Sequence, residues 1–98
     1  MSTKSPNSVD VHVGRRIKMR RMMLDVSQSD LGEKSGITFQ QIQKYEKGSN
    51  RVSASRIHEF ANMLDVPVSF FFEGLASNGA KLKSGQYDLA QQLLATRD

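Results

Sequence analysis

The chain has 98 residues, of which 38% are hydrophobic and 24% are charged, and this composition is typical of one soluble globular domain. It contains no cysteine, so disulfides, thiolate metal sites and cysteine nucleophiles are excluded. No apolar run approaches the roughly 20 residues that a membrane span needs, and residues 1–10 lack the apolar stretch of a secretory signal. We therefore expect a cytoplasmic protein.

The formal net charge of +4 is concentrated in the first half of the chain. Residues 10–51 contain nine lysines and arginines against five acids, whereas residues 73–98 contain three of each. A positive field of this kind favours a polyanionic partner, with nucleic acid ahead of an anionic membrane surface. A basic helix that is merely solvated is the alternative explanation.

The first elements in chain order are a polar arm and a helix. Residues 1–9 are polar and rich in serine, which predicts a disordered arm. A helix over residues 10–24, capped by Asp10, is predicted from one inward-facing stripe: Val13, Ile17, Arg21 and Leu24. Three methionines of this helix are expected to fill the core or to pack at the edge of the core: Met19, Met22 and Met23.

Two short helices follow, and capping residues bound both of them. Gln28–Ser35 and Phe39–Lys47 are each preceded by a hydroxyl side chain that can cap the helix, namely Ser27 and Thr38. Each is followed by a glycine that can adopt the left-handed conformation of a helix end, Gly36 or Gly48. A helix of this length is not stable alone, so the pair predicts a helix-turn-helix in which residues 35–37 form the turn.

The rest of the chain is also predicted to be helical. Ser53 caps a fourth helix, and Pro67 opens a short fifth helix, Val68–Phe72, that ends at Gly74. A linker and a last helical segment over residues 84–96 complete the chain. No segment shows the alternation of a strand. We therefore predict an all-α protein, with a five-helix domain over residues 10–74 and a C-terminal tail over residues 75–98.

The second helix of the pair has one face suited to DNA. On a helical wheel, Ile42 and Tyr45 point inward. The side chains of the opposite face are all amides or ammonium groups: Gln40, Gln43, Lys44 and Lys47. Phe39 lies at the edge of this face. Glutamine can read adenine and lysine can bind guanine or a phosphate in a major groove. A solvated surface without a partner is the alternative, but such a surface usually mixes glutamate with lysine.

Residues 27–38, followed by Ile42 and by residues 45–48, resemble the Cro/repressor-type helix-turn-helix family of phage repressors and XRE-like bacterial regulators. Residues 64–74 resemble that family's closing segment, so the resemblance covers about residues 10–74. It implies a five-helix bundle that binds double-stranded DNA as a two-fold homodimer.

The resemblance also implies roles for individual residues. Gln28 would bind a phosphate and brace the recognition helix, and Asn50 and Arg51 would meet the DNA backbone. The positions that face bases or adjacent phosphates are Thr38, Phe39, Gln40 and Lys44. Phe39 departs from the family's polar residue; its ring can contact a thymine methyl or tuck against the preceding helix.

Three features are assigned to the scaffold or to assembly. In the family, Arg21 and Glu46 form an internal ion pair, which an inward-facing arginine needs. Three further arginines are placed on the outer faces of the first helix, where they contact phosphates or keep the protein soluble: Arg15, Arg16 and Arg20. The aromatic run suggests a dimer contact, with internal packing as the alternative: Phe70, Phe71 and Phe72.

These observations favour a sequence-specific transcriptional regulator, with repression of a palindromic operator by a homodimer as the leading hypothesis. The alternative is an antitoxin-like autoregulator whose C-terminal segment, residues 82–94, binds a regulatory protein partner. Membrane binding by the first helix is disfavoured because its apolar residues are needed for the core. The chain shows no nucleophile–base grouping, metal spacing or phosphate loop, so we expect no enzyme, metal or cofactor.

Overall fold

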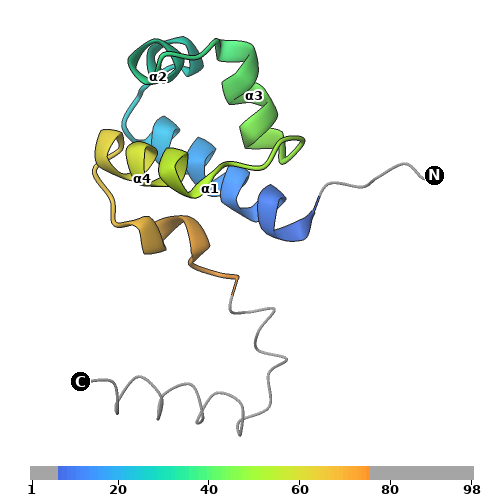
Figure 1. Ribbon diagram of the computed structural model, residues 1–98. Helices are drawn as coiled ribbons and strands as arrows, with labels where there is room; N and C mark the ends of the chain where they lie inside the picture. Colours follow the sequence, from blue (N-terminus) through green and yellow to red (C-terminus); the bar gives the residue numbers. More distant parts are fainter. Residues whose placement is uncertain (1–6, 76–98) are drawn as a thin grey trace, which may run out of the picture.

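The computed structural model describes residues 7–75, which form four α-helices and one 3₁₀ helix (Figure 1). The elements are α1 (Ser8–Met23), α2 (Gln28–Ser35), α3 (Phe39–Lys47), α4 (Ala54–Met63) and η1 (Val68–Phe72). Most of the predicted N-terminal arm and the predicted C-terminal helix, with the partner-binding segment over residues 82–94, lie outside the described residues. The described part is all-α, as the sequence predicts.

The short fifth helix has the predicted bounds, Val68–Phe72, but it is a 3₁₀ helix, so the described residues contain four α-helices and not five. The Phe70 amide donates to the Pro67 carbonyl at 2.9 Å, and the Glu73 amide donates to the Phe70 carbonyl at 3.3 Å. Both bonds span three residues, which is the 3₁₀ pattern and is common in short connecting pieces. Five residues between a proline and an extended Glu73 are too few for a stable α-helix.

The first helix also differs from the prediction at both ends. It begins at Ser8, because the Asn7 side chain caps it by accepting from the amides of Val9 at 2.8 Å and Asp10 at 3.3 Å. Asparagine is among the best capping residues, so residues 8 and 9 belong to the helix and not to an arm. At the other end, the backbone turns at Asp25 with φ of 59°, which leaves Leu24 exposed.

The caps predicted for the other helices are confirmed. The hydroxyls of Ser27, Thr38 and Ser53 each accept from the amide three residues later, at 2.9 to 3.1 Å. Gly36 and Gly48 end α2 and α3 with φ of 76° and 79°. These local signals fix the turn between α2 and α3, and with it the angle at which α3 stands on the domain (Figure 1).

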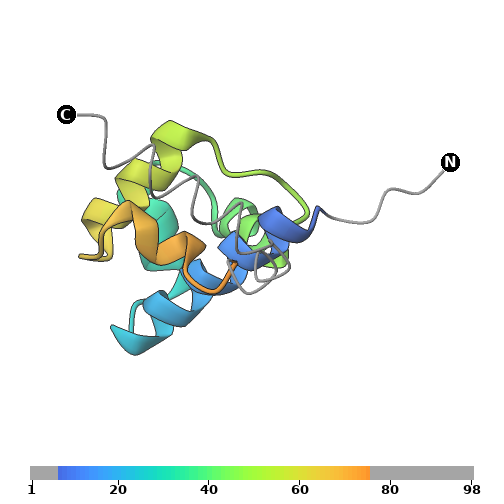
Figure 2. The same ribbon diagram turned by 90° about the horizontal axis from the view of Figure 1, so that it is seen from below.

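The core lies between α1, α4 and η1 on one side and the helix-turn-helix on the other. Phe60 and Phe71 are its largest fully buried side chains, and Tyr45 packs edge-on against Phe60 with ring centroids 6.0 Å apart. Figure 2 shows η1 running alongside α1. The other core residues are aliphatic: Val13, Ile17, Leu31, Ile42, Val52, Ile57, Ala61 and Leu64.

The three methionines of α1 do not fill the core, contrary to the prediction. Met19, Met22 and Met23 are all exposed, because the buried stripe of α1 consists of Val13, Gly14, Ile17 and Arg21. Half-buried Met63 of α4 packs against the core instead.

Candidate nucleic-acid interface

The exposed side of α3 carries most of the side chains that were predicted to face DNA. Thr38, Phe39, Gln40, Lys44 and Lys47 are exposed, while Gln43 is half-buried. On the opposite side of the helix, Ile42 is fully buried. The helix therefore presents a carboxylate-free surface, and Phe39, at 38% exposed, is open both to a thymine methyl and to packing against α2.

A buried ion pair fastens α3 to α1 directly behind this surface. Arg21 Nε donates to Glu46 Oε2 at 2.6 Å, and Arg21 Nη2 donates to Glu46 Oε1 at 3.0 Å. The exposed fractions of the two side chains are only 10% and 3%. A third bond runs from Arg21 Nη1 to the Val26 carbonyl at 2.9 Å. Bidentate pairing and full hydrogen bonding are what a buried guanidinium requires.

The same carboxylate also holds the first residue of α2. Gln28 Nε2 donates to Glu46 Oε1 at 3.0 Å, and Gln43 Nε2 donates to Gln28 Oε1 at 3.3 Å. Gln28 is half-buried, and its amide bridges α2 and α3. Its contact with a phosphate stays a prediction.

Gly14 allows α1 and α3 to approach each other next to the ion pair. A Cβ at this position would overlap the Tyr45 carbonyl oxygen and lie 2.7 Å from the Glu46 carbonyl oxygen. Because both obstacles are backbone atoms, no side-chain rotation relieves them. The position of α3 therefore depends on glycine at residue 14.

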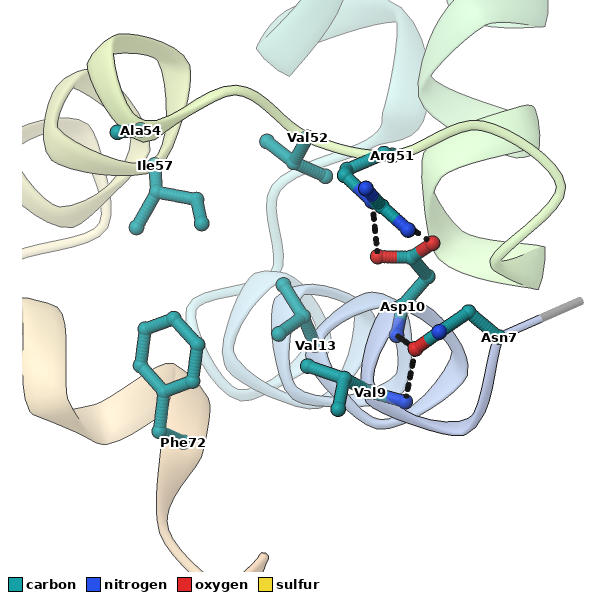
Figure 3. A pocket seen from close by; sticks show the side chains of 9 residues that line it. All are labelled: Asn7, Val9, Asp10, Val13, Arg51, Val52, Ala54, Ile57 and Phe72. Carbon is teal, nitrogen blue, oxygen red and sulfur yellow. Dashed lines mark hydrogen bonds and ion pairs between the residues drawn. The ribbon is translucent and has the colours of Figure 1, made fainter.

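The loop after α3 carries Asn50 and Arg51, both exposed. Arg51 Nε is 3.2 Å from each carboxylate oxygen of Asp10, which anchors the loop to the first turn of α1 (Figure 3). The exposed fractions are 72% for the Arg51 side chain and 14% for that of Asp10. Sequence reasoning missed this pair, since it assigned Asp10 to helix capping and had no signal for a contact 41 residues away.

Two arginines of α1 have a different role from either one expected. Arg20 Nε donates to the Leu64 carbonyl at 2.8 Å, and Arg16 Nε donates to the Phe70 carbonyl at 2.8 Å. Arg16 also pairs with Glu73 at 3.0 Å. Arg20 thus satisfies the carbonyl of Leu64, the residue that ends α4, and Arg16 shares the Phe70 carbonyl with the Glu73 amide. Only Arg15 is fully available to solvent or to a phosphate.

The three consecutive phenylalanines have three different environments. Phe71 is 0% exposed and belongs to the core, so its prediction as a dimer contact is wrong. Phe70 is half-buried, packs edge-on against Phe71 with ring centroids 5.6 Å apart, and lies under the Arg16 guanidinium at 3.9 Å. Phe72 keeps the largest exposed face, at 36%. A 3₁₀ helix separates successive side chains by about 120°, which explains the difference.

Residues 7–75 contain neither a metal-binding cluster nor a membrane-spanning helix. No group of three histidine, aspartate or glutamate side chains in this range could hold a metal ion. Among the helices of the same range, none is both long and apolar enough to cross a membrane.

Comparisons with known proteins agree with this geometry. The helix-turn-helix family HTH_3 matches residues 17–71. An uncharacterized HTH-type transcriptional regulator of Sinorhizobium medicae is 62% identical over 76 residues, which are 78% of this chain and 55% of that protein. An uncharacterized transcriptional regulator in the ATPase CF(0) region of Rhodospirillum rubrum is 48% identical over 73 residues, which are 74% of this chain and 68% of that protein.

Two solved structures share the fold. The DNA-binding domain of BldD aligns with a TM-score of 0.61 at 24% identity, covering 69% of this chain and 97% of that one. The clp gene regulator ClgR from Corynebacterium glutamicum aligns with a TM-score of 0.67 at 20% identity, covering 95% and 98%. The chain spans about half the length of the first two curated relatives that it matches.

The family match covers more than half of the chain, and the relatives share the segment that builds the helix-turn-helix. The chain therefore belongs to the Cro/repressor-type, XRE-like family of helix-turn-helix transcriptional regulators.

Proposed function

We propose that the chain is a sequence-specific repressor that binds a palindromic operator as a homodimer, with α3 in the major groove. The observation that carries the proposal is the carboxylate-free exposed side of α3, held from behind by the buried Arg21–Glu46 pair. In such domains the N-terminal residues of the recognition helix reach the base edges. A rigidly held α3 keeps those residues in a defined register.

The residues divide into those that read sequence and those that fix position. Gln40 lies near the start of α3 and can donate to and accept from one adenine, while the exposed Phe39 ring can contact a thymine methyl. Phosphate contacts are assigned to side chains at the start of α2, at the N-cap of α3, along the rest of α3 and in the following loop: Gln28, Thr38, Gln43, Lys44, Lys47, Asn50 and Arg51.

Replacement of Gln40 with alanine should change which sequences are bound, while replacement of Arg51 with alanine should weaken all sequences alike. Loss of a bidentate base contact is expected to cost roughly 1–3 kcal/mol at one base pair, whereas a phosphate contact carries no sequence information. Affinities for a selected duplex and for its single-base variants measure the difference at one fixed salt concentration.

Ser55→Ala, at an exposed position on α4, is the control and should leave every affinity unchanged. Equal weakening of selected and random duplexes by Gln40→Ala would contradict the proposed placement of α3.

Genomic fragments selected by the full chain should contain an imperfect palindrome with half-sites about ten base pairs apart. One recognition helix reads too few bases for specificity, and a two-fold dimer places two of them about 34 Å apart, which is one turn of B-DNA. We assign the dimer contact to the apolar edge that η1 forms together with the C-terminal segment of the same chain. Sedimentation should give two chains per palindromic duplex. One chain per duplex, with a single unrepeated half-site, would rule out the dimer.

A further inference from the structure

An open groove lies beside η1, and none of the side chains proposed to read bases lines it, although Arg51 lies at its edge. Its volume is about 410 Å³, which is within the size range of ligand sites. Figure 3 shows Phe72 on one side, the first turns of α1 opposite, and Ile57 at the start of α4. Apolar side chains form most of its wall: Val9, Val13, Val52, Ala54, Ile57 and Phe72.

Three of these apolar residues are exposed, namely Val9, Ala54 and Phe72. The exposed fractions are 41% for Val9 and 36% for Phe72. Polar groups occur at one edge only, where Asn7 caps α1 and Asp10 pairs with Arg51. Those polar groups already have partners within the domain, so the groove offers apolar area more than hydrogen bonds. A matching occupant is an apolar segment.

The chain leaves the described domain at the rim of this groove. The Glu73 carbonyl oxygen is hydrogen-bonded to His12 Nε2 at 2.6 Å, and the Glu73 carboxylate pairs with Arg16 at 3.0 Å. Both contacts hold residue 73 against α1. His12 precedes Val13 and lies one helical turn from Val9. The backbone that continues past Leu75 therefore starts next to the groove.

The sequence beyond Leu75 has the composition of a linker followed by an apolar segment. Residues 76–81 are small or polar, and Leu82, Leu89 and Leu93 follow. Leu89 and Leu93 have the spacing of one helical face. Six linker residues reach about 20 Å, and a short tether gives an effective concentration in the millimolar range. A second copy of the chain would compete poorly with such a tethered segment.

We propose that the groove binds the chain's own segment of residues 82–94, which covers Val9 and Phe72. This intramolecular docking site does not depend on the proposed base contacts, because only Arg51, a proposed phosphate contact, is shared between the groove wall and the DNA-binding residues. The docked segment extends the apolar edge formed by η1 and adds a further layer to a small core.

Cysteine cross-linking in the full chain tests the proposal, because the chain has no other thiol. Ala54→Cys in the groove wall is combined, in separate proteins, with Leu82→Cys, Leu89→Cys or Leu93→Cys. Asn62→Cys, at the far exposed end of α4, replaces Ala54→Cys in the controls. For at least one pair, intrachain disulfide formation at low protein concentration should be ten-fold or more faster from position 54 than from position 62.

A second measurement does not depend on the cysteines. Phe72→Ser should accelerate amide hydrogen exchange in residues 82–94 at least ten-fold, whereas Met23→Ser, at an exposed position at the other end of α1, should not. Equal cross-linking rates from positions 54 and 62, or unchanged exchange in a folded Phe72→Ser chain, would overturn the proposal. Predominantly interchain disulfides from position 54 would identify a second copy as the occupant and would also overturn it. DNA affinity is measured separately, so failure here leaves the DNA-binding proposal intact.

Discussion

Replacement of Glu46 with alanine should lower the free energy of unfolding by about 3–5 kcal/mol, since it leaves the Arg21 guanidinium buried without its counter-ion. Both carboxylate oxygens of Glu46 accept from Arg21, and one also accepts from Gln28. A loss of this size is a large part of the 5–15 kcal/mol that stabilises a typical domain. Urea denaturation followed by circular dichroism measures the change.

Two further variants isolate the effect of burial. Glu59 forms a comparable ion pair with Arg56 at 2.7 Å, but the exposed fraction of its side chain is 39%, so Glu59→Ala should cost at most about 1 kcal/mol. Changing Arg21 and Glu46 together to methionine removes both charges and should recover most of the stability lost in Glu46→Ala. Equal losses in Glu46→Ala and Glu59→Ala would show that burial of the pair is not what matters.

Replacement of Gly14 with alanine should destabilise the domain by at least about 2 kcal/mol, although alanine is the better helix former by about 1 kcal/mol. The added methyl group would overlap the backbone of α3 at Tyr45 and Glu46, so α1 and α3 must move apart. The melting temperature and urea midpoint of the variant measure the loss.

Arg15→Ala is the matched control for this substitution, because it introduces the same residue at the next position of the same helix. Arg15 is exposed, and surface changes of this kind usually alter stability by less than about 0.5 kcal/mol. A Gly14→Ala chain as stable as the Arg15→Ala chain would mean that the two helices separate without cost.

Local chemistry made much of the fold predictable from the sequence. Ser27, Thr38 and Ser53 bind amides three residues away, and Gly36 and Gly48 end helices by their own backbone conformation. Errors arose where the structure depends on distant partners. Arg16 and Arg20 bind carbonyls 54 and 44 residues away, and no pattern within α1 indicates those partners.

The candidate site was predictable to a similar extent. The wheel of α3 placed Gln40, Lys44 and Lys47 outward, because helical periodicity alone determines which side faces the core. The Asp10–Arg51 pair and the Gln28 bridge depend on how α1 and α2 meet α3, which is tertiary information. The different environments of Phe70, Phe71 and Phe72 depend in turn on a 3₁₀ geometry that apolar composition does not reveal.

Glu46 of α3 is bonded to both α1 and α2, and these bonds also determine which groups lose conformational entropy when the domain binds DNA. Because the backbone of α3 is already fixed by Arg21 and Gln28, little of the loss comes from ordering the helix. It falls on the exposed side chains, at about 0.5–1.5 kcal/mol for each long side chain that becomes immobile. Lys44 and Lys47 have the longest of these side chains. A shorter polar side chain at either position would lose a contact with DNA, but it would also lose less conformational entropy on binding.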